Sequence, residues 1–272
     1  MVVDDPKDLP FAPDLLHGQV AIVTGGGSGL GRGIALGLAA VGAAVAVTGR
    51  RQARLDEVAA EITGAGGRAA AIPCDIRDPE AVEAMVAAAE AALGPAGILV
   101  NNAGATFTAP AETLSPNAFR SVVETDAFGT FYACQSAGRR WIERGSGGAI
   151  LNITSTSPMT GNPGRIHGGV GKAGVDSLTK SLAVEWGRHG IRVNALAPGY
   201  TPTAGVDKAT GASAVGLEAG VPLGRVGTVR DIAWPAVFLV SPIAAFVNGA
   251  VLVVDGGKWL SSGRSFTAAS PS

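Results

Sequence analysis

The sequence predicts a single α/β domain in which a doubly wound parallel sheet carries helices on both faces. From Gln19 onward, short apolar strands alternate with amphipathic helices, and this alternation is typical of a parallel sheet. Hydrophobic residues make up 47% of the 272 residues and charged residues 16%, with glycine at 40 positions, which suits a large core joined by tight turns. Because such alternating folds often reach this length as one unit, we expect one domain.

Strands and helices are predicted in regular order along the chain. The strands are short apolar runs, expected at residues 19–24, 43–49, 68–75, 97–101, 148–154, 191–197 and 250–256. The helices repeat apolar residues with the helical period and are expected from about residue 29 and at residues 51–63, 79–93, 115–144 and 170–188. Two helices carry a clear start signal, since Asp78 stands before Pro79 and Ser115 stands before Pro116. We therefore expect a seven-stranded sheet.

The two ends of the chain and one internal loop are expected to lie outside this alternation. Residues 1–14 are predicted to form an N-terminal extension, residues 15–260 the domain, and residues 261–272, which are small and polar, a flexible tail. Residues from about 200 to 222 are rich in Thr, Ala and Gly and show no clear period. They follow a predicted strand end, where open α/β sheets bind ligands, so we expect a substrate loop there, with a plain surface excursion as the alternative.

Charge and cysteine content argue against several classes of partner. The formal net charge of −1 gives no electrostatic footprint for nucleic acid or for an anionic membrane, so a small-molecule substrate is the expected partner. Cys74 and Cys134 are the two cysteines, and they lie outside any zinc or redox spacing, so no metal site is expected. No apolar run reaches bilayer length, and we expect a cytoplasmic protein that does not enter the membrane.

A glycine-rich segment joins the first predicted strand to the first predicted helix. The stretch TGGGSGLGRGIA at residues 24–35 places Gly25, Gly29 and Gly31 where the backbone must turn sharply and approach a ligand closely. Free N–H groups at the start of the helix would then face an anion, such as the pyrophosphate of a dinucleotide. Glycines also serve ordinary tight turns, but the strand before this segment and the helix after it favour a Rossmann-type cofactor site.

The end of the second predicted strand indicates which dinucleotide binds. This strand ends in TGRR, so Arg50 and Arg51 stand where an acidic residue would hydrogen-bond the ribose hydroxyls of NAD. Guanidinium groups pair with a 2′-phosphate, and the sequence therefore favours NADPH/NADP. The alternative is that one or both arginines are solvated charges at the start of a helix.

Three motifs resemble those of the classical short-chain dehydrogenase/reductase family. They are TGxxxGxG at residues 24–31, NNAG at residues 101–104 and VNALAPG at residues 193–199, and the resemblance extends from about residue 15 to residue 260. It implies a Rossmann-type NADP-binding domain that assembles as a homotetramer. Besides the two arginines, it implies cofactor contacts at Gly25, Ser28, Gly29, Leu30, Asp75, Ile76, Asn102, Ala103, Gly104, Lys172, Pro198 and Gly199.

The catalytic set implied by this resemblance is altered at two positions. Family members usually carry Asn, Ser, Tyr and Lys, with the Tyr four residues before the Lys. Here Lys172 is in place and Ser155 stands at the serine position, but Gly168 replaces the tyrosine and Asp126 replaces the asparagine. A carboxyl group in an apolar cleft can have its pKa raised and can act as a general acid, so Asp126 is the candidate proton source.

This altered set is similar to one branch of the family, the 2,4-dienoyl-CoA reductases, and above all to the peroxisomal type. That type similarly has Asp in the long helix, no Tyr before the Lys, and a His directly upstream, matched here by His167. The resemblance implies an auxiliary enzyme of fatty-acid β-oxidation. NADPH would deliver a hydride to C5 of an acyl-CoA, and water activated by Asp126 would protonate the α-carbon to give a 3-enoyl-CoA. Lys172 would hold the nicotinamide ribose and stabilise the enolate.

Other interpretations of these residues remain open. Asp126 could be a structural carboxylate paired with Lys172, which is the common fate of buried acids. Ser155 could simply satisfy a strand end, and His167 could be an ordinary residue of a helix entry. The protein could then reduce another carbonyl or an imine, or it could bind NADPH without turnover.

Overall fold

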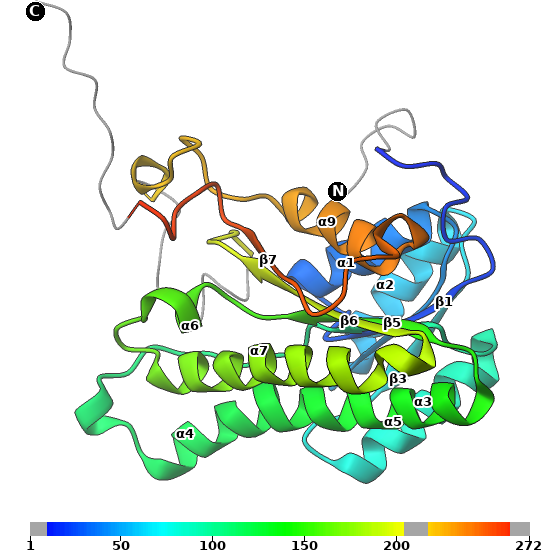
Figure 1. Cartoon of the computed structure of the whole chain (residues 1–272), viewed down its shortest axis with the longest axis horizontal. Helices are drawn as coiled ribbons and strands as arrows, with labels where there is room; N and C mark the ends of the chain where they lie inside the picture. Colours follow the sequence, from blue (N-terminus) through cyan, green and yellow to red (C-terminus); the bar gives the residue numbers. More distant parts are fainter. Residues whose placement is uncertain (1–9, 204–216, 262–272) are drawn as a thin grey trace, which may run out of the picture.

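The computed structural model describes residues 10–203 and 217–261, which form a seven-stranded sheet between two layers of helices (Figure 1). The strand order is β3-β2-β1-β4-β5-β6-β7, and all neighbouring strands are parallel. The predicted fold class is therefore confirmed. The first nine residues of the predicted N-terminal extension, most of the predicted substrate loop, and the predicted tail beyond residue 261 lie outside the described residues.

The regular elements lie close to their predicted positions. The strands are β1 (Val20–Thr24), β2 (Ala44–Gly49), β3 (Ala69–Pro73), β4 (Ile98–Asn101), β5 (Gly148–Ile153), β6 (Ile191–Pro198) and β7 (Val251–Val254). The α-helices are α1 (Gly29–Ala40), α2 (Gln52–Gly64), α3 (Pro79–Leu93), α4 (Pro116–Val123), α5 (Gly129–Arg144), α6 (Ser157–Thr160), α7 (Ile166–Trp186) and α9 (Val229–Val240). Shorter helical segments are η2 (Ala111–Thr113), η3 (Glu124–Phe128), η4 (Gly187–His189), η5 (Glu218–Gly220) and η6 (Pro242–Ala244).

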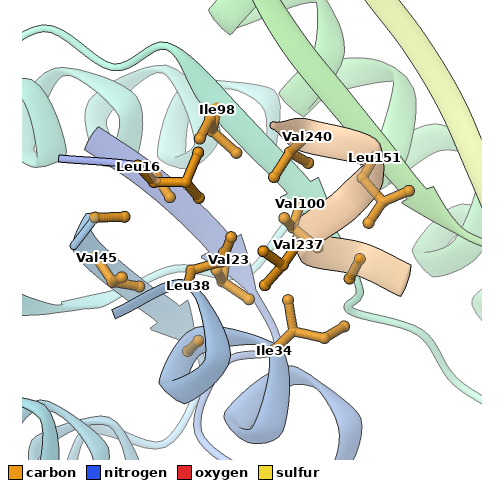
Figure 2. Close-up of a cluster of buried hydrophobic side chains, with 14 of the residues drawn as sticks. Leu16, Val23, Ile34, Leu38, Val45, Ile98, Val100, Leu151, Val237 and Val240 are labelled. Atoms are coloured by element: carbon orange, nitrogen blue, oxygen red, sulfur yellow. The ribbon is translucent and has the colours of Figure 1, made fainter. Parts of the chain in front are cut away.

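The sheet is buried on both faces because alternate residues of its central strands serve two separate cores. On one face, Val23 of β1 packs with Ile34 of α1 and Val237 of α9 (Figure 2). On the other face, Ile22 of β1 belongs to a cluster that includes Trp141 of α5. Parallel strands that are covered on both faces read as continuous apolar runs, which is how these strands appear in the sequence.

Two predicted helix starts are confirmed by their hydrogen bonds. The Asp78 side chain accepts hydrogen bonds from the backbone N–H groups of Glu80 and Ala81, at 2.9 and 3.3 Å, at the start of α3. The Ser115 side chain accepts one from the N–H of Ala118, at 3.2 Å, at the start of α4. These caps satisfy donors that the first turn of a helix leaves without partners.

Three helical features differ from the prediction. The helix expected at residues 115–144 is interrupted by η3, a π-helical segment at Glu124–Phe128. The helix expected from residue 170 begins at Ile166, one turn earlier, and the added turn contains two glycines, which disfavour helix on propensity alone. Helix α9 was not predicted, because Pro235 lies inside it, although Thr228 forms a capping box at its start.

All seven strands point the same way, so their carboxyl ends lie along one edge of the sheet. This edge carries the ends of β1, β4, β5 and β6, together with the loops that follow them. Ligands of open α/β sheets bind at such an edge, near the point where the strand order reverses between β1 and β4. The residues expected to bind a cofactor or a substrate all follow from this edge.

Candidate active site

The glycine-rich loop between β1 and α1 packs directly against the segment that follows β4. Gly25 has φ of +65°, a left-handed conformation that favours glycine, and a Cβ there would lie 2.8 Å from the Asn102 side-chain nitrogen. The same nitrogen donates a hydrogen bond to the Thr24 carbonyl at 3.0 Å. The N–H groups of Asn102 and Ala103 both donate to the Thr24 hydroxyl at 3.0 Å. The two motifs therefore brace each other.

The start of α1 presents backbone donors at this loop. The first helical hydrogen bond runs from the Arg32 N–H to the Ser28 carbonyl, at 3.1 Å, so the N–H groups of Gly29 and Leu30 precede the helical ladder. The Ser28 side chain does not cap the helix, and the first turn contains no acidic residue. These features fit the pyrophosphate of a dinucleotide, which a helix start binds through its N–H groups and its dipole.

Two arginines follow β2 at the position expected for a 2′-phosphate. Arg50 and Arg51 are exposed, and their guanidinium groups form no hydrogen bond or ion pair within residues 10–203 and 217–261. Arg54, one turn further along α2, is instead paired with Glu57 at 3.0 Å. The positive charges of Arg50 and Arg51 are therefore available to an anionic ligand.

Asp75 lies near these arginines, but its carboxylate is already held by a neighbour. Arg77 donates to it from Nε at 2.9 Å and from a terminal nitrogen at 2.5 Å. These hydrogen bonds lower the pKa of Asp75 to about 2, with Arg50 as a smaller contributor. The sequence offered only one signal for Arg77, its position two residues after Asp75. Ile76 between them is buried, and it fills the space beside Gly129.

Asp126 lies in the π-helical segment η3 and points into the site. Its side chain is 1% exposed, and Oδ1 accepts a hydrogen bond from the Ala105 N–H at 2.9 Å. Burial raises the pKa of this carboxyl group, against the opposing effects of Lys172 and of the Ala105 N–H. Short π-helical segments are frequent at functional sites because they redirect a side chain within a long helix.

Lys172 reaches from α7 to the end of β5 and lies beside Asp126. Its Nζ donates to the Ile153 carbonyl at 2.9 Å and lies 3.9 Å from Asp126 Oδ2. A separation of 3.9 Å is too long for a hydrogen bond, so the amine hydrogen-bonds the carbonyl at the end of β5 and not the Asp126 carboxyl group. The Asp126 carboxyl group is near a positive charge without being closed off by it.

Gly168 lies one helical turn before Lys172, on the same side of α7. A Cβ at this position would meet a single atom within 4 Å, the Thr106 hydroxyl oxygen at 3.7 Å. The place where a tyrosine side chain would start is therefore not filled by any of the residues that the structure describes. Lys172 supplies an amine and Asp126 a carboxyl group, and residue 168 supplies no phenol.

Comparisons with known proteins agree with this arrangement. The family model described as enoyl-(acyl carrier protein) reductase matches residues 25–258. The chain belongs to the short-chain dehydrogenase/reductase family. A Bacillus subtilis relative named as a 2,4-dienoyl-CoA reductase that produces (2E)-enoyl-CoA is 42% identical over 247 residues, which cover 89% of this chain and 97% of that protein. The rat peroxisomal 2,4-dienoyl-CoA reductase, named as (3E)-enoyl-CoA-producing, is 42% identical over 254 residues, or 92% of this chain and 87% of that protein.

A solved structure adds evidence on the cofactor. The Beutenbergia cavernae protein described as an NAD(P)-dependent gluconate 5-dehydrogenase, with bound NADP, superposes with a TM-score of 0.85 at 40% identity, covering 92% of this chain and 100% of that one. Members of this family use NAD(P), so the protein is an NAD(P)-dependent oxidoreductase.

His167 forms part of the wall of the reductase site. Its ring is fully buried and stacks on Phe107, with the ring centroids 4.2 Å apart and the planes at 24°. Neither ring nitrogen has a hydrogen-bond partner among the described residues. Burial lowers the pKa of His167, while nearby Asp126 opposes this shift. The residue is therefore more than an exposed helix entry, and it is a neutral imidazole near neutral pH.

Ser155 lies at the rim of the site, just after β5. Its hydroxyl oxygen accepts a hydrogen bond from the Ser157 N–H at 3.3 Å. The side chain is half-buried and supports the short turn that starts α6. Pro198 and Gly199 lie at the end of the neighbouring strand β6, where the Gly199 N–H donates to the Val254 carbonyl at 2.9 Å.

The structure adds two residues that the sequence did not single out. Thr106 follows the NNAG motif and faces Gly168, as described above. Asp176 lies one turn beyond Lys172 on α7 and is 8% exposed. Burial raises the pKa of Asp176, and a hydrogen bond with Thr154 opposes this. Asp176 could have been found from the sequence, because it stands four residues after Lys172 and so shares a side of α7 with it. Thr106 could not, because it reaches the site through a long-range contact.

Two searches of the described residues gave no candidates. Residues 10–203 and 217–261 contain no group of three or more His, Cys, Asp or Glu side chains placed to hold a metal ion. Within the same ranges, no helix is both long enough and apolar enough to cross a membrane.

Proposed function

We propose that this enzyme reduces 2,4-dienoyl-CoA thioesters to 3-enoyl-CoA, with NADPH as the hydride donor. The observation that carries the proposal is a buried carboxyl group, Asp126, beside Lys172, where Gly168 leaves no phenol. The names of the Bacillus subtilis and rat relatives support this substrate class. An auxiliary role in fatty-acid β-oxidation follows from the same chemistry.

The proposed chemistry explains why a tyrosine is not needed. A carbonyl reductase must protonate an oxygen as hydride arrives, whereas a dienoyl thioester accepts hydride at a carbon and forms a dienolate. NADPH, when bound, supplies the hydride that C5 accepts, and the dienolate then takes one proton at the α-carbon. Overall, one hydride and one proton add across the conjugated system. The acid is therefore needed beside a carbon, and Asp126, not a side chain at residue 168, supplies it.

Asp126 holds the water that delivers this proton. Its raised pKa keeps a larger fraction of the carboxyl group protonated near neutral pH than an exposed aspartate would have. The Ala105 N–H fixes Oδ1, so Oδ2 is the oxygen left to bind water. Lys172 holds the ribose and places a positive charge near the developing enolate, which stabilises it in a site with little water.

Two further residues have supporting roles in this proposal. Ser155 lines the rim at the end of β5, where its hydroxyl can orient the thioester. His167 stays neutral and, stacked on Phe107, fixes the loop after β4 against the start of α7. Both residues therefore position the substrate and leave proton delivery to Asp126.

NADPH is the proposed cofactor because the charges of Arg50 and Arg51, at the end of β2, have no partner in the part of the chain that the structure describes. The adenine would lie by Asp75 and Ile76. The remaining contacts come from Gly25, Ser28, Gly29, Leu30, Asn102, Ala103, Gly104, Lys172, Pro198 and Gly199, which line the same edge of the sheet.

Assembly as a homotetramer and a cytoplasmic location are part of the proposal. Several large apolar side chains are exposed on η3, on α5, on α7 and just after η6, namely Phe128, Phe131, Val184 and Phe246. Exposed apolar groups gathered on helix faces mark protein interfaces. Cys74 and Cys134 are free thiols, which suits a reducing compartment.

The test is the rate of NADPH oxidation with a dienoyl-CoA in wild type and in Asp126→Asn. We expect kcat to fall by about 100-fold or more in the variant, which is the usual contribution of a general acid, while NADPH affinity stays within a few-fold. Glu124→Gln changes a carboxyl group in the same π-helical segment and serves as the matched control. An unchanged rate in Asp126→Asn would rule out the proposed proton route.

Two other outcomes would favour the alternative functions. Turnover of ketones or imines without turnover of dienoyl thioesters would indicate a different reductase. Tight NADPH binding with no turnover of either class would indicate a silent binding protein.

A further inference from the structure

The missing side chain at Gly168 leaves an opening beside the proposed proton donor. We call this opening the Gly168 recess, bounded by Gly168 on α7 and by Thr106 on the loop after β4. Among residues 10–203 and 217–261, the nearest atom to a Cβ placed at Gly168 is the Thr106 hydroxyl oxygen, at 3.7 Å, and no second neighbour comes within 4 Å. Both residues have accessible surface, so the recess opens outward.

The walls of the recess are held in place by contacts on either side of it. The loop after β4 runs alongside the entry to α7, so that Phe107 stacks on His167 and the Ala109 N–H donates to the Gly164 carbonyl at 2.9 Å. A Cβ at Gly164 would lie 3.1 Å from the Thr108 methyl group, so the two segments are in close contact there as well. Because both neighbouring contacts are tight, the walls cannot collapse to fill the recess.

The position of the recess relates it to one carbon of the substrate. Gly168 and Lys172 share a side of α7, and Lys172 Nζ lies 3.9 Å from the carboxyl group of Asp126. In the proposed function, which this inference rests on, water on Asp126 protonates the α-carbon. The α-carbon must therefore lie on this side of α7, near the recess that a tyrosine would have filled.

We propose that the Gly168 recess admits a substituent on the α-carbon, so that the enzyme reduces α-branched dienoyl-CoA thioesters. A methyl group on this carbon would clash with a side chain at residue 168 and is accommodated by its absence. Gly168 is thus a specificity-determining residue. The branched substrate undergoes the same reaction as the unbranched one. One hydride adds at C5 and one proton at the α-carbon, and no further reactant is needed.

Protonation of an α-methyl substrate has a consequence that an unbranched substrate lacks. The α-carbon of the product then carries four different groups and becomes a stereocentre. Since the proton comes from the side of Asp126, the product forms as predominantly one stereoisomer. The ratio of the two stereoisomers therefore reports from which side the proton is delivered, in addition to whether the substrate is accepted.

The experiment compares 2,4-decadienoyl-CoA with its 2-methyl analogue in four proteins: wild type, Gly168→Ala, Gly168→Val and Gly169→Ala. The measured quantity is the ratio of kcat/KM for the methylated substrate to kcat/KM for the unbranched one. Gly168→Ala should fold, because its Cβ meets Thr106 at an ordinary contact distance of 3.7 Å. Gly169→Ala is the matched control on the next residue, where a Cβ has nothing within 4 Å.

We expect wild type to reduce both substrates and Gly168→Ala to lower the ratio by about 10-fold or more, the usual effect of one methyl group in a fitted pocket. Gly168→Val should lower it further, and Gly169→Ala should leave it within about two-fold of wild type. The 2-methyl product should be one stereoisomer.

The inference is overturned if wild type reduces the unbranched thioester but not the methylated one, or if Gly168→Ala leaves the ratio unchanged. If neither thioester is reduced while NADPH still binds, the proposed function itself has failed. The unbranched substrate therefore separates the two failures.

Discussion

Gly171 lies so close to Asp126 that a Cβ at Gly171 would come within 2.8 Å of the Asp126 Cβ and 3.3 Å of its Oδ2. The backbone of α7 therefore presses directly on the proposed proton donor. On its other side, Oδ1 is held by the Ala105 N–H. The Asp126 carboxyl group therefore lies between the backbone of α7 at Gly171 and the backbone of the loop at Ala105. Either backbone can move only if the whole helix or the whole loop moves with it.

Replacing Gly171 with alanine should displace the carboxyl group without removing it. A misplacement of about 1 Å at a reacting group costs on the order of 100-fold in rate, so we expect kcat with a dienoyl-CoA to fall by about 10- to 100-fold. NADPH affinity, measured by fluorescence titration, should stay within a few-fold because the glycine-rich loop is untouched. Gly169→Ala is the control, and equal losses in both variants would contradict the role of the Gly171 contact.

Ionisation of Asp126 should make stability depend on pH. Its pKa is raised in the folded protein above the ordinary value of 3.8, so the folded state holds its proton over a range where the unfolded state has lost it. The free energy of unfolding should therefore decrease as pH rises from 3.8 through the raised pKa, and Asp126→Asn should remove this decrease. Urea unfolding of both proteins at a series of pH values from 3.8 upward measures the effect. Parallel pH profiles would show that the carboxyl group ionises normally.

Much of the fold was predictable because it depends on local patterns. The start of α3 at Asp78 and Pro79 needs only a cap and a fixed φ, which the sequence displays directly. The π-helical segment was not predictable, since residues 116–144 carry the apolar period of one long helix. What decides that segment is its packing against α7, a contact between residues far apart in the chain.

In the candidate site, too, some features could be predicted from the sequence and others depend on contacts between distant residues. The proximity of Asp126 to Lys172 could be anticipated, because the resemblance to the short-chain dehydrogenase/reductase family places both in the catalytic set. The contact of Thr106 with Gly168 could not, because it depends on how a loop without regular structure lies against a helix entry. Arg77 was missed for a different reason: a charged residue at a turn usually indicates only solvent exposure, and Arg77 is indeed exposed, but it also hydrogen-bonds Asp75.

Removing the arginines after β2 should change the choice of cofactor. In the double variant Arg50→Ala, Arg51→Ala we expect KM for NADPH to rise by about 100-fold or more, since two charge-assisted hydrogen bonds are removed and each contributes roughly 1.5–3 kcal/mol. KM for NADH should change by less than about two-fold, because NADH lacks the 2′-phosphate. Arg54→Ala is the control, as this arginine is paired with Glu57. A parallel rise for both dinucleotides would mean that the arginines only support the fold.

The position of the added proton can be followed with deuterium. When the reaction runs in D₂O, we expect deuterium at the α-carbon of a 3-enoyl product, because Asp126 and its water lie on that side of α7 in the proposed function. Mass spectrometry and NMR of the product locate the label. Deuterium at C4 with a 2-enoyl product would instead mean that the proton is added one conjugated position further along, and the water on Asp126 would then have to lie elsewhere.

The π-helical segment at Glu124–Phe128 should make the fold tolerant of a single-residue deletion at this point of the chain. Such a segment contains one residue more than an α-helical turn requires, and its neighbours α4 and α5 are already in line. Deleting a single residue, which ordinarily shifts everything downstream, would here restore an unbroken α-helix and keep both ends in register. The chain would keep its fold but lose the π-helical bulge that orients Asp126. A deletion in this short segment could therefore remove the activity of a descendant protein while its fold is retained.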